Sequence, residues 1–174
     1  MKELKLVLPN NELSLKEVGL FVRSEHLLKL LHEKELYTDR PFHGCSEAEI
    51  KILEQEMGIK LPETYRQYLL AVGHYSGRLF QGTDTNFSQI KELQSETVEL
   101  LRENNNPVVL PDSTFVFSMH QGYEIRFFKL NEGDNPPVME WYEGSTKGII
   151  KLYDSFEEFL SDSIYQHTVI RWLD

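Results

Sequence analysis

The first hundred residues of this chain place apolar side chains at the three- and four-residue spacing of amphipathic helices. A capping box at residues 14–17 opens a helical N-terminal element, which has a predicted break near Ser24 and ends at the turn over residues 37–41. A second helix is predicted to begin at the capping box of residues 46–49 and to end at Gly58. The pattern thus predicts two helical segments before residue 60.

Two further helical segments and a short strand are predicted between residues 61 and 103. Leu61 and Pro62 open a helix that Gly73 ends, because proline suits the first helical turn and glycine suits the residue after the last. A short strand is expected at residues 78–80, and Asn86 is the expected N-cap of the next helix.

After residue 110 the apolar pattern changes to that of β-strands. Apolar segments at residues 115–119, 123–130, 138–142 and 149–152 alternate with short connections rich in turn residues, so neighbouring strands are expected to pair antiparallel as a meander. In the second segment apolar and charged residues alternate, as they do when one face of a sheet is packed and the other is wet. The helices, including a last one that opens at residues 155–158, are expected to cover the packed face.

Helices followed by a run of strands and a final helix are typical of an α+β domain, because a parallel α/β domain would alternate the two throughout. We expect one such domain over residues 46–174, with residues 1–45 as a helical extension packed on it. No internal repeat or low-complexity linker points to a second tethered domain.

The predicted helix after Asn86 carries an acidic stripe, because its glutamates follow one another at spacings of four, three and four residues. Such a stripe is either a solvated helix face or a docking surface for a basic partner. Its residues are the first candidates for partner binding: Glu92, Glu96, Glu99 and Glu103.

Trp141 and Tyr142, with Glu143 beside them, are the second group of candidates for partner binding. Tryptophan and tyrosine are frequent among the residues that dominate binding energies at protein interfaces. Adjacent strand residues point to opposite faces, so one of the two aromatic side chains is expected in the core and the other at the surface.

The charge balance favours a protein partner over nucleic acid. The 174 residues include 18 Lys and Arg against 28 Asp and Glu, which gives a formal net charge of -10. Nucleic-acid binding draws on clustered basic residues, whereas an acidic surface attracts a basic protein. Composition alone favours the alternative that the acidic excess only keeps the protein soluble.

Cys45 is the single cysteine, so an internal disulfide is excluded and a reducing compartment is favoured. The chain contains no basic leader followed by an apolar run and no segment with the roughly 20 apolar residues of a membrane span. We therefore expect a soluble cytoplasmic protein. His43 and Cys45 supply two zinc ligands at most, without a second pair at suitable spacing, so no metal is expected.

Linear signatures of common enzymes, such as a P-loop, a GxGxxG segment, an HExxH helix, a GxSxG elbow or paired CxxC motifs, do not occur. Acid–base groups can still be drawn around His120, either with Glu124 or with Asp112 and Ser113, but nearness in sequence does not establish such geometry. We expect a non-enzymatic protein without a cofactor. An enzyme of unknown type stays open, because a fold does not exclude activity.

Residues 46–73, SEAEIKILEQEMGIKLPETYRQYLLAVG, resemble the entry of the SUKH superfamily. The family pattern there is an acidic capped helix with Ile, followed by Leu-Glu, Gly, Leu-Pro, an aromatic residue and Leu. In this chain the matching residues are Ile50, Leu53, Glu54, Gly58, Leu61, Pro62, Tyr65 and Leu69. Weaker similarity extends to about residue 165, and the stretch before Cys45 does not align.

This superfamily includes many bacterial toxin-immunity proteins and fungal regulators of cell-wall assembly. The resemblance implies an α+β fold and, for bacterial members, a non-enzymatic protein that covers a polymorphic toxin, often a nuclease. We therefore expect an immunity protein that binds and neutralises a cognate toxin, and the alternative is an intracellular regulator or scaffold of envelope assembly. The family has no universal set of functional residues, so the candidates above are argued from physical chemistry alone.

Overall fold

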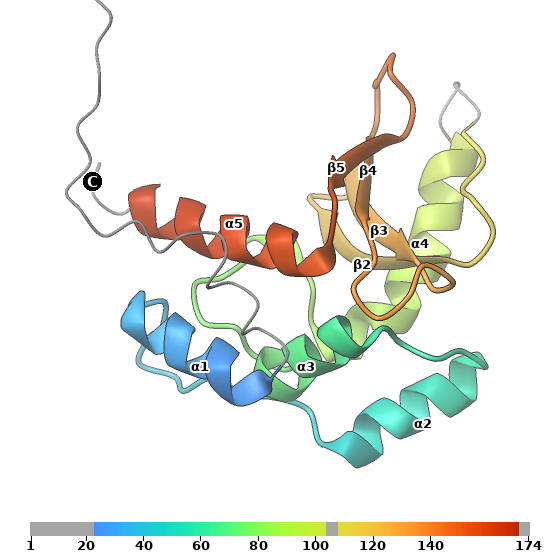
Figure 1. Ribbon diagram of the computed structural model, residues 1–174. Helices are drawn as coiled ribbons and strands as arrows, with labels where there is room; N and C mark the ends of the chain where they lie inside the picture. Colours follow the sequence, from blue (N-terminus) through green and yellow to red (C-terminus); the bar gives the residue numbers. More distant parts are fainter. Residues whose placement is uncertain (1–22, 104–107, 171–174) are drawn as a thin grey trace, which may run out of the picture.

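Five antiparallel strands form the centre of the computed structural model, which describes residues 23–103 and 108–170 (Figure 1). Their spatial order follows the chain, β1-β2-β3-β4-β5, and every neighbouring pair is antiparallel, so the predicted meander is confirmed. The strands are β1 (Thr83–Asp84), β2 (Thr114–His120), β3 (Glu124–Lys129), β4 (Val138–Tyr142) and β5 (Ile150–Tyr153).

Apart from the two-residue β1, the strands follow one another directly in the chain between α4 and α5, which confirms the α+β class. They are α1 (Ser24–Glu33), α2 (Glu47–Met57), α3 (Glu63–Val72), the short 3-10 helix η1 (Phe87–Gln89), α4 (Ile90–Glu103) and α5 (Phe156–Ile170). The predicted capping box at residues 14–17 lies outside the described residues.

The predicted start and end of α2 are confirmed. The hydroxyl of Ser46 accepts a hydrogen bond from the amide of Glu49 at 3.3 Å, while a carboxylate oxygen of Glu49 accepts one from the amide of Ser46 at 2.7 Å. The helix ends at Gly58, whose φ of 66° is a left-handed conformation that favours glycine. Local side-chain chemistry therefore fixes where α2 begins and ends.

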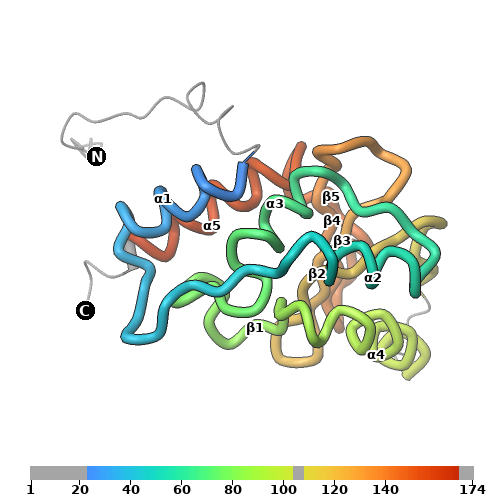
Figure 2. Tube along the Cα trace, turned by 90° about the horizontal axis from the view of Figure 1, so that it is seen from below, coloured from blue at the N-terminus to red at the C-terminus, as the bar shows by residue number. Residues whose placement is uncertain are grey.

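Helices cover both faces of the sheet, so the expectation that they pack on one face is wrong. Phe115, Phe117 and Phe128 belong to a core shared with α1, α2, α3 and α5, whereas Val116 and Phe127 belong to a second core on the opposite face. There α4 packs against the sheet through its buried Leu93, on the side away from α5 (Figures 1 and 2). The five consecutive buried residues at the centre of β2 are the local consequence of this double covering.

The core beneath α3 is mainly aromatic. Tyr65 of α3 is buried and its ring lies 5.3 Å from that of Phe128, 5.6 Å from that of Phe115 and 5.4 Å from that of Phe156, measured between centroids. Large rings meeting edge to face at these distances bury much apolar surface and add a favourable quadrupole interaction. This cluster holds α3 and α5 on the same face of the sheet.

The described part of the N-terminal extension shares this core. Leu27 and Leu31 of α1 and the following Leu36 are buried, and α1 packs directly on α3. Glu35, at the turn after α1, has a φ of 54°. The predicted boundary near residue 45 is therefore no break in the core, and the division into two parts stays a prediction.

The strand predicted at residues 78–80 is wrong. Residues 77–82 form a turn in which Phe80 has a φ of 60°, an uncommon conformation for a bulky residue. The turn buries Leu79 and lays the ring of Phe80 on that of Phe159, with 5.5 Å between centroids and 4° between planes. Packing against α5 thus overrides the local β preference, and the strand begins at Thr83 instead.

Cys45 is expected to be inert toward thiol reagents in the folded protein. The side chain is 6% exposed, and burial, with a smaller effect of Glu49, raises the pKa of its thiol to about 12. Because the thiolate is the reactive form, 5,5′-dithiobis(2-nitrobenzoate) should react only after addition of denaturant. Stoichiometric reaction of the native protein within minutes would contradict the burial of this residue.

Candidate functional site

The four glutamates of the predicted stripe lie on the outer side of α4. Glu92, Glu96, Glu99 and Glu103 are all exposed, while Leu93 on the other side of the helix is buried against the sheet. Within residues 23–103 and 108–170, no ion pair involves any of the four. We call this surface the α4 stripe.

Several other carboxylates of the described chain are neutralised by nearby cations. Arg66 of α3 is the clearest case, because its guanidinium contacts Glu54 at 2.7 Å, Glu47 at 2.5 Å and Glu63 at 3.8 Å. The α4 stripe therefore differs from the α2–α3 surface by having uncompensated charge, as a surface for a basic partner would. Whether a partner binds there stays a prediction.

Trp141 is a core residue, so its side chain cannot contact a partner at the surface of the folded protein. It is 1% exposed and packs with Ile125, its neighbour across β3, in the core beneath α4. Tyr142 is 38% exposed and is therefore the surface member of the pair, on the sheet face away from α4. The exposed Glu143 follows it, and its amide donates to the carbonyl of Tyr123 at 2.8 Å. The predicted candidates thus lie on two surfaces rather than one.

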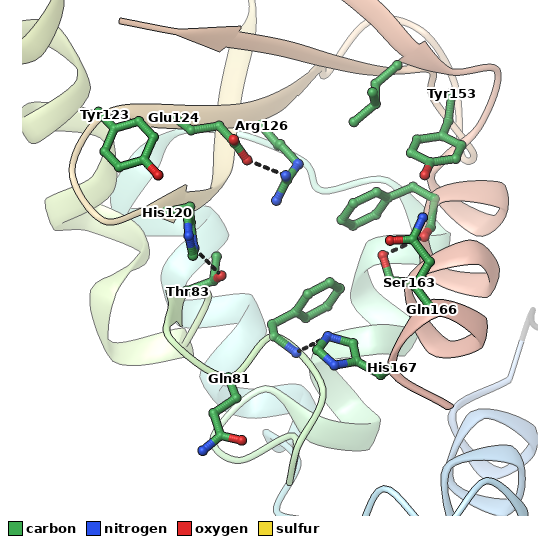
Figure 3. A pocket seen from close by; sticks show the side chains of 13 residues that line it. Gln81, Thr83, His120, Tyr123, Glu124, Arg126, Tyr153, Ser163, Gln166 and His167 are labelled. Atoms are coloured by element: carbon green, nitrogen blue, oxygen red, sulfur yellow. Dashed lines mark hydrogen bonds and ion pairs between the residues drawn. The ribbon is translucent and has the colours of Figure 1, made fainter. Parts of the chain in front are cut away.

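A groove of about 420 Å³ opens on the sheet face that carries Glu124, the residue paired with Tyr142 across β3 and β4 (Figure 3). The turn at residues 77–82 and β1 form one wall, the β2–β3 hairpin another, and β5 and α5 the third. We call it the sheet-face groove, and its main lining residues are Phe80, His120, Tyr123, Glu124, Arg126, Tyr153, Phe159 and His167.

Arg126 forms an ion-pair network along one side of the sheet-face groove. Its guanidinium contacts Glu124 on the same strand and donates to a carboxylate oxygen of Glu140 on β4 at 3.1 Å. Burial raises the pKa of Glu140, and the guanidinium opposes that shift. One cation therefore serves two partly buried carboxylates.

A third carboxylate lies behind the groove on α5. Asp162 accepts hydrogen bonds from the hydroxyl of Tyr153 and from the amide of Gln166, the latter at 2.6 Å. Burial and the bond to Asp162 raise the pKa of Tyr153, so its phenol stays protonated and acts as a donor. Asp162 thus adds negative charge without a neighbouring cation among its bonded partners.

His120 does not belong to a catalytic triad. Its Nδ1 is hydrogen-bonded to the hydroxyl of Thr83 at 2.9 Å, and Glu124 is its partner directly across the β2–β3 ladder. Asp112 and Ser113 precede the opposite end of β2, a strand of seven residues, so the drawn triad does not assemble. His120 and Glu124 do both line the groove.

His167 holds the turn of residues 77–82 in place from α5. Its Nε2 accepts a hydrogen bond from the amide of Phe80 at 3.3 Å, a role that requires the unprotonated nitrogen. Burial lowers the pKa of His167 below 6.5, which agrees with that role.

The lowered pKa of His167 predicts a loss of stability in mild acid. The unfolded chain binds this proton more readily than the folded one, so stability falls as pH drops through the unfolded pKa of 6.5. Melting temperatures measured from pH 7.5 to 5.5 should decrease more for the wild type than for His167→Gln, which does not titrate. Parallel decreases in the two proteins would assign the acid sensitivity to other groups.

The described residues offer no metal centre and no membrane span. Among them, no group of three or more His, Cys, Asp and Glu side chains is placed to hold a metal, and no helix is both long and apolar enough to cross a bilayer. His43 instead exchanges backbone hydrogen bonds with Tyr75, and its ring lies 4.9 Å from that of His74.

Sequence reasoning missed the sheet-face groove because its walls come from segments more than 80 residues apart, such as Phe80 and His167. One local signal was present, since Glu124 and Arg126 alternate with Ile125 and Phe127. That alternation indicated that one face of β3 is exposed to solvent. Residues of α5 line the groove on that face together with Glu124 and Arg126.

A protein-family model matches the chain over most of its length. The family model described as "SMI1 / KNR4 family (SUKH-1)" matches residues 44–162 of the chain. The match begins next to Cys45 and ends within α5, so it spans the sheet and most of the helices. No curated protein shows significant similarity to the chain.

Proposed function

Because the chain belongs to the SMI1/KNR4 family (SUKH-1), we propose that it is an immunity protein, which binds a bacterial toxin domain and blocks it by occupancy. Family membership supports toxin immunity or a related function at the level of the family. The toxin itself, its nuclease activity and the cytoplasm as the place of action are parts of the proposal. The buried thiol of Cys45 agrees with a reducing compartment.

The α4 stripe is the observation that carries the proposal for this chain. Four exposed carboxylates without ion-pair partners among the described residues raise the local negative potential on one helix face. Such a surface speeds encounter with a basic partner and favours one orientation of docking. A toxin that acts on nucleic acid has a basic surface for its substrate, so an acidic protein fits over it.

Co-expression tests the proposal directly. The toxin domain encoded next to this chain should arrest growth when expressed alone, and growth should recover when the two are produced together. The two proteins should also co-purify at a 1:1 ratio. Recovery of growth without a complex would point to another mode of protection. If growth does not recover and no complex forms, the immunity role is rejected.

Regulation of envelope assembly is the second candidate, favoured by the fungal cell-wall regulators within the superfamily that the chain resembles. A regulator would leave the adjacent toxin unopposed and would change sensitivity to cell-wall inhibitors when its gene is deleted. An immunity protein should neutralise that toxin, and deletion of its gene should leave sensitivity to cell-wall inhibitors unchanged. One deletion strain therefore separates the two functions.

A further inference from the structure

The sheet-face groove carries more negative charge than its resident cation balances. Glu124 lines the groove directly, Glu140 lies behind Arg126, and Asp162 lies behind Tyr153. Arg126 is the single Lys or Arg among the lining residues, and its guanidinium is shared between Glu124 and Glu140. The Nε2 of His167 accepts a hydrogen bond from the Phe80 amide, so it has no proton to offer Asp162.

The walls of the groove are aromatic, which suits a planar cation. The stacked rings of Phe80 and Phe159 line it. Tyr123, which is 40% exposed, lines it next to Glu124 (Figure 3). Arg126 shows that these walls accept a guanidinium, because its Cζ lies 5.9 Å from the centroid of the Phe159 ring. Cations are attracted to aromatic faces, most strongly where water is excluded.

The groove has room for a side chain and a rim suited to a protein. Its 420 Å³ falls within the range of pockets that enclose small ligands, and it is open along one side. Tyr142 is exposed and lies opposite Glu124 across β3 and β4, and Glu143 is bonded to the backbone of Tyr123. Exposed tyrosines around a charged depression are typical of residues that dominate binding energy.

We propose that the sheet-face groove is a socket for an arginine or lysine side chain of a basic protein partner, with Glu124 as the anionic contact and Asp162 adding negative charge through its hydrogen bonds with Tyr153 and Gln166. The inference rests on the proposed function, since the toxin is the expected basic partner. It adds a second contact on the sheet face away from the α4 stripe. The two tyrosines at the rim then pack against the partner's backbone around the inserted side chain.

The socket can be tested on the isolated full-length protein with N-acetyl-L-arginine amide, which presents one arginine side chain and no other charge. Titration followed by ¹H–¹⁵N NMR should give saturable shifts of resonances from Tyr123, Glu124 and Gln166, and the glutamine analogue should give none. Inorganic phosphate is the competing probe. If phosphate shifts the resonances of groove residues and the arginine amide does not, the groove is an anion site at Arg126 and the proposal is overturned. Absence of any shift in the resonances of groove residues would also overturn it.

Two substitutions within the ion-pair network should act in opposite directions. Glu124→Gln removes one anionic contact and is expected to weaken binding of the arginine amide about tenfold, the size of one charge-assisted hydrogen bond. Arg126→Ala vacates the place of a guanidinium between two carboxylates and is expected to strengthen binding. A folding defect would weaken binding in both variants, so opposite signs identify the socket. Asp134→Asn, at an exposed site in the β3–β4 turn, is the matched control.

The outcome separates the socket from the immunity role. The NMR titration needs no toxin, so a failed titration with successful growth rescue removes the socket and leaves the function. If Glu124→Gln weakens binding of the arginine amide but the toxin neither arrests growth nor forms a complex, the cation site is supported and the proposed partner is wrong. Both results together would assign this groove to the toxin interface once Glu124→Gln also weakens the complex.

Discussion

Trp141→Ala is expected to lower the free energy of unfolding by about 3–5 kcal/mol, whereas Tyr142→Ala should change it by about 1 kcal/mol at most. The two residues are adjacent in β4, yet Trp141 is 1% exposed and Tyr142 is 38% exposed. Removing the indole leaves a cavity between the sheet and α4, lined by residues such as Ile125 and Leu93. Urea unfolding followed by circular dichroism measures both changes.

The same pair gives its own control in a binding measurement. Tyr142→Ala should weaken the complex with the toxin while lowering the melting temperature by about 2–4 °C at most, because the side chain lies at the surface. Trp141→Ala should weaken the complex only under conditions in which part of the protein is unfolded. Loss of affinity in a fully folded Trp141→Ala protein, with Tyr142→Ala unaffected, would contradict this assignment of core and surface.

Reversing all four residues of the α4 stripe to lysine is expected to slow association with the toxin by about 10- to 100-fold at low salt. Each reversal changes the charge by two units, so the net charge goes from -10 to about -2. The wild-type rate should fall steeply as salt is added, whereas the rate of the reversed protein should be nearly flat. Stopped-flow measurements from 20 to 500 mM salt would resolve the difference.

A charge-matched variant separates the stripe from net charge. Glu25, Asp39, Asp112 and Asp134 are exposed acidic residues outside α4, and their reversal to lysine gives the same net charge. The account predicts that this control keeps most of the wild-type association rate. Equal slowing in both variants would show that overall charge, and not the α4 stripe, steers the encounter.

The sequence predicted the elements whose limits depend on local chemistry. The capping box at Ser46 and the left-handed Gly58 bound α2 as expected, because their hydrogen bonds and dihedral angles involve residues close in the chain. The strand pattern after residue 110 also gave the meander, since short turns leave antiparallel pairing as the simplest arrangement.

Features that depend on long-range packing were not predictable in the same way. Phe80 has the β preference of an aromatic residue, but its stacking on Phe159, 79 residues later, places it in a turn. The apolar positions of α4 do not state which face of the sheet they cover, so its place opposite α5 required the structure. The apolar run of β2, in which Ser118 is the one polar residue between Phe115 and Met119, was a usable sign that both faces are buried.

The candidate site divides in the same way. The α4 stripe was predictable in full, because helical periodicity alone brings its glutamates onto one exposed face. For Trp141 and Tyr142, alternation predicted that one would be buried but could not say which. The sheet-face groove was not predictable, because its lining comes from β1, β2, β3, β5 and α5.

A titration of toxin activity with this protein tests most directly whether it acts by occupying its partner. With the toxin well above the dissociation constant, activity should fall in a straight line and reach zero at one molar equivalent. Toxin separated from the complex should regain full activity with an unchanged mass. Complete loss of activity at a small fraction of an equivalent, or a permanent change in the toxin's mass, would show that the protein transforms its partner and would contradict the account.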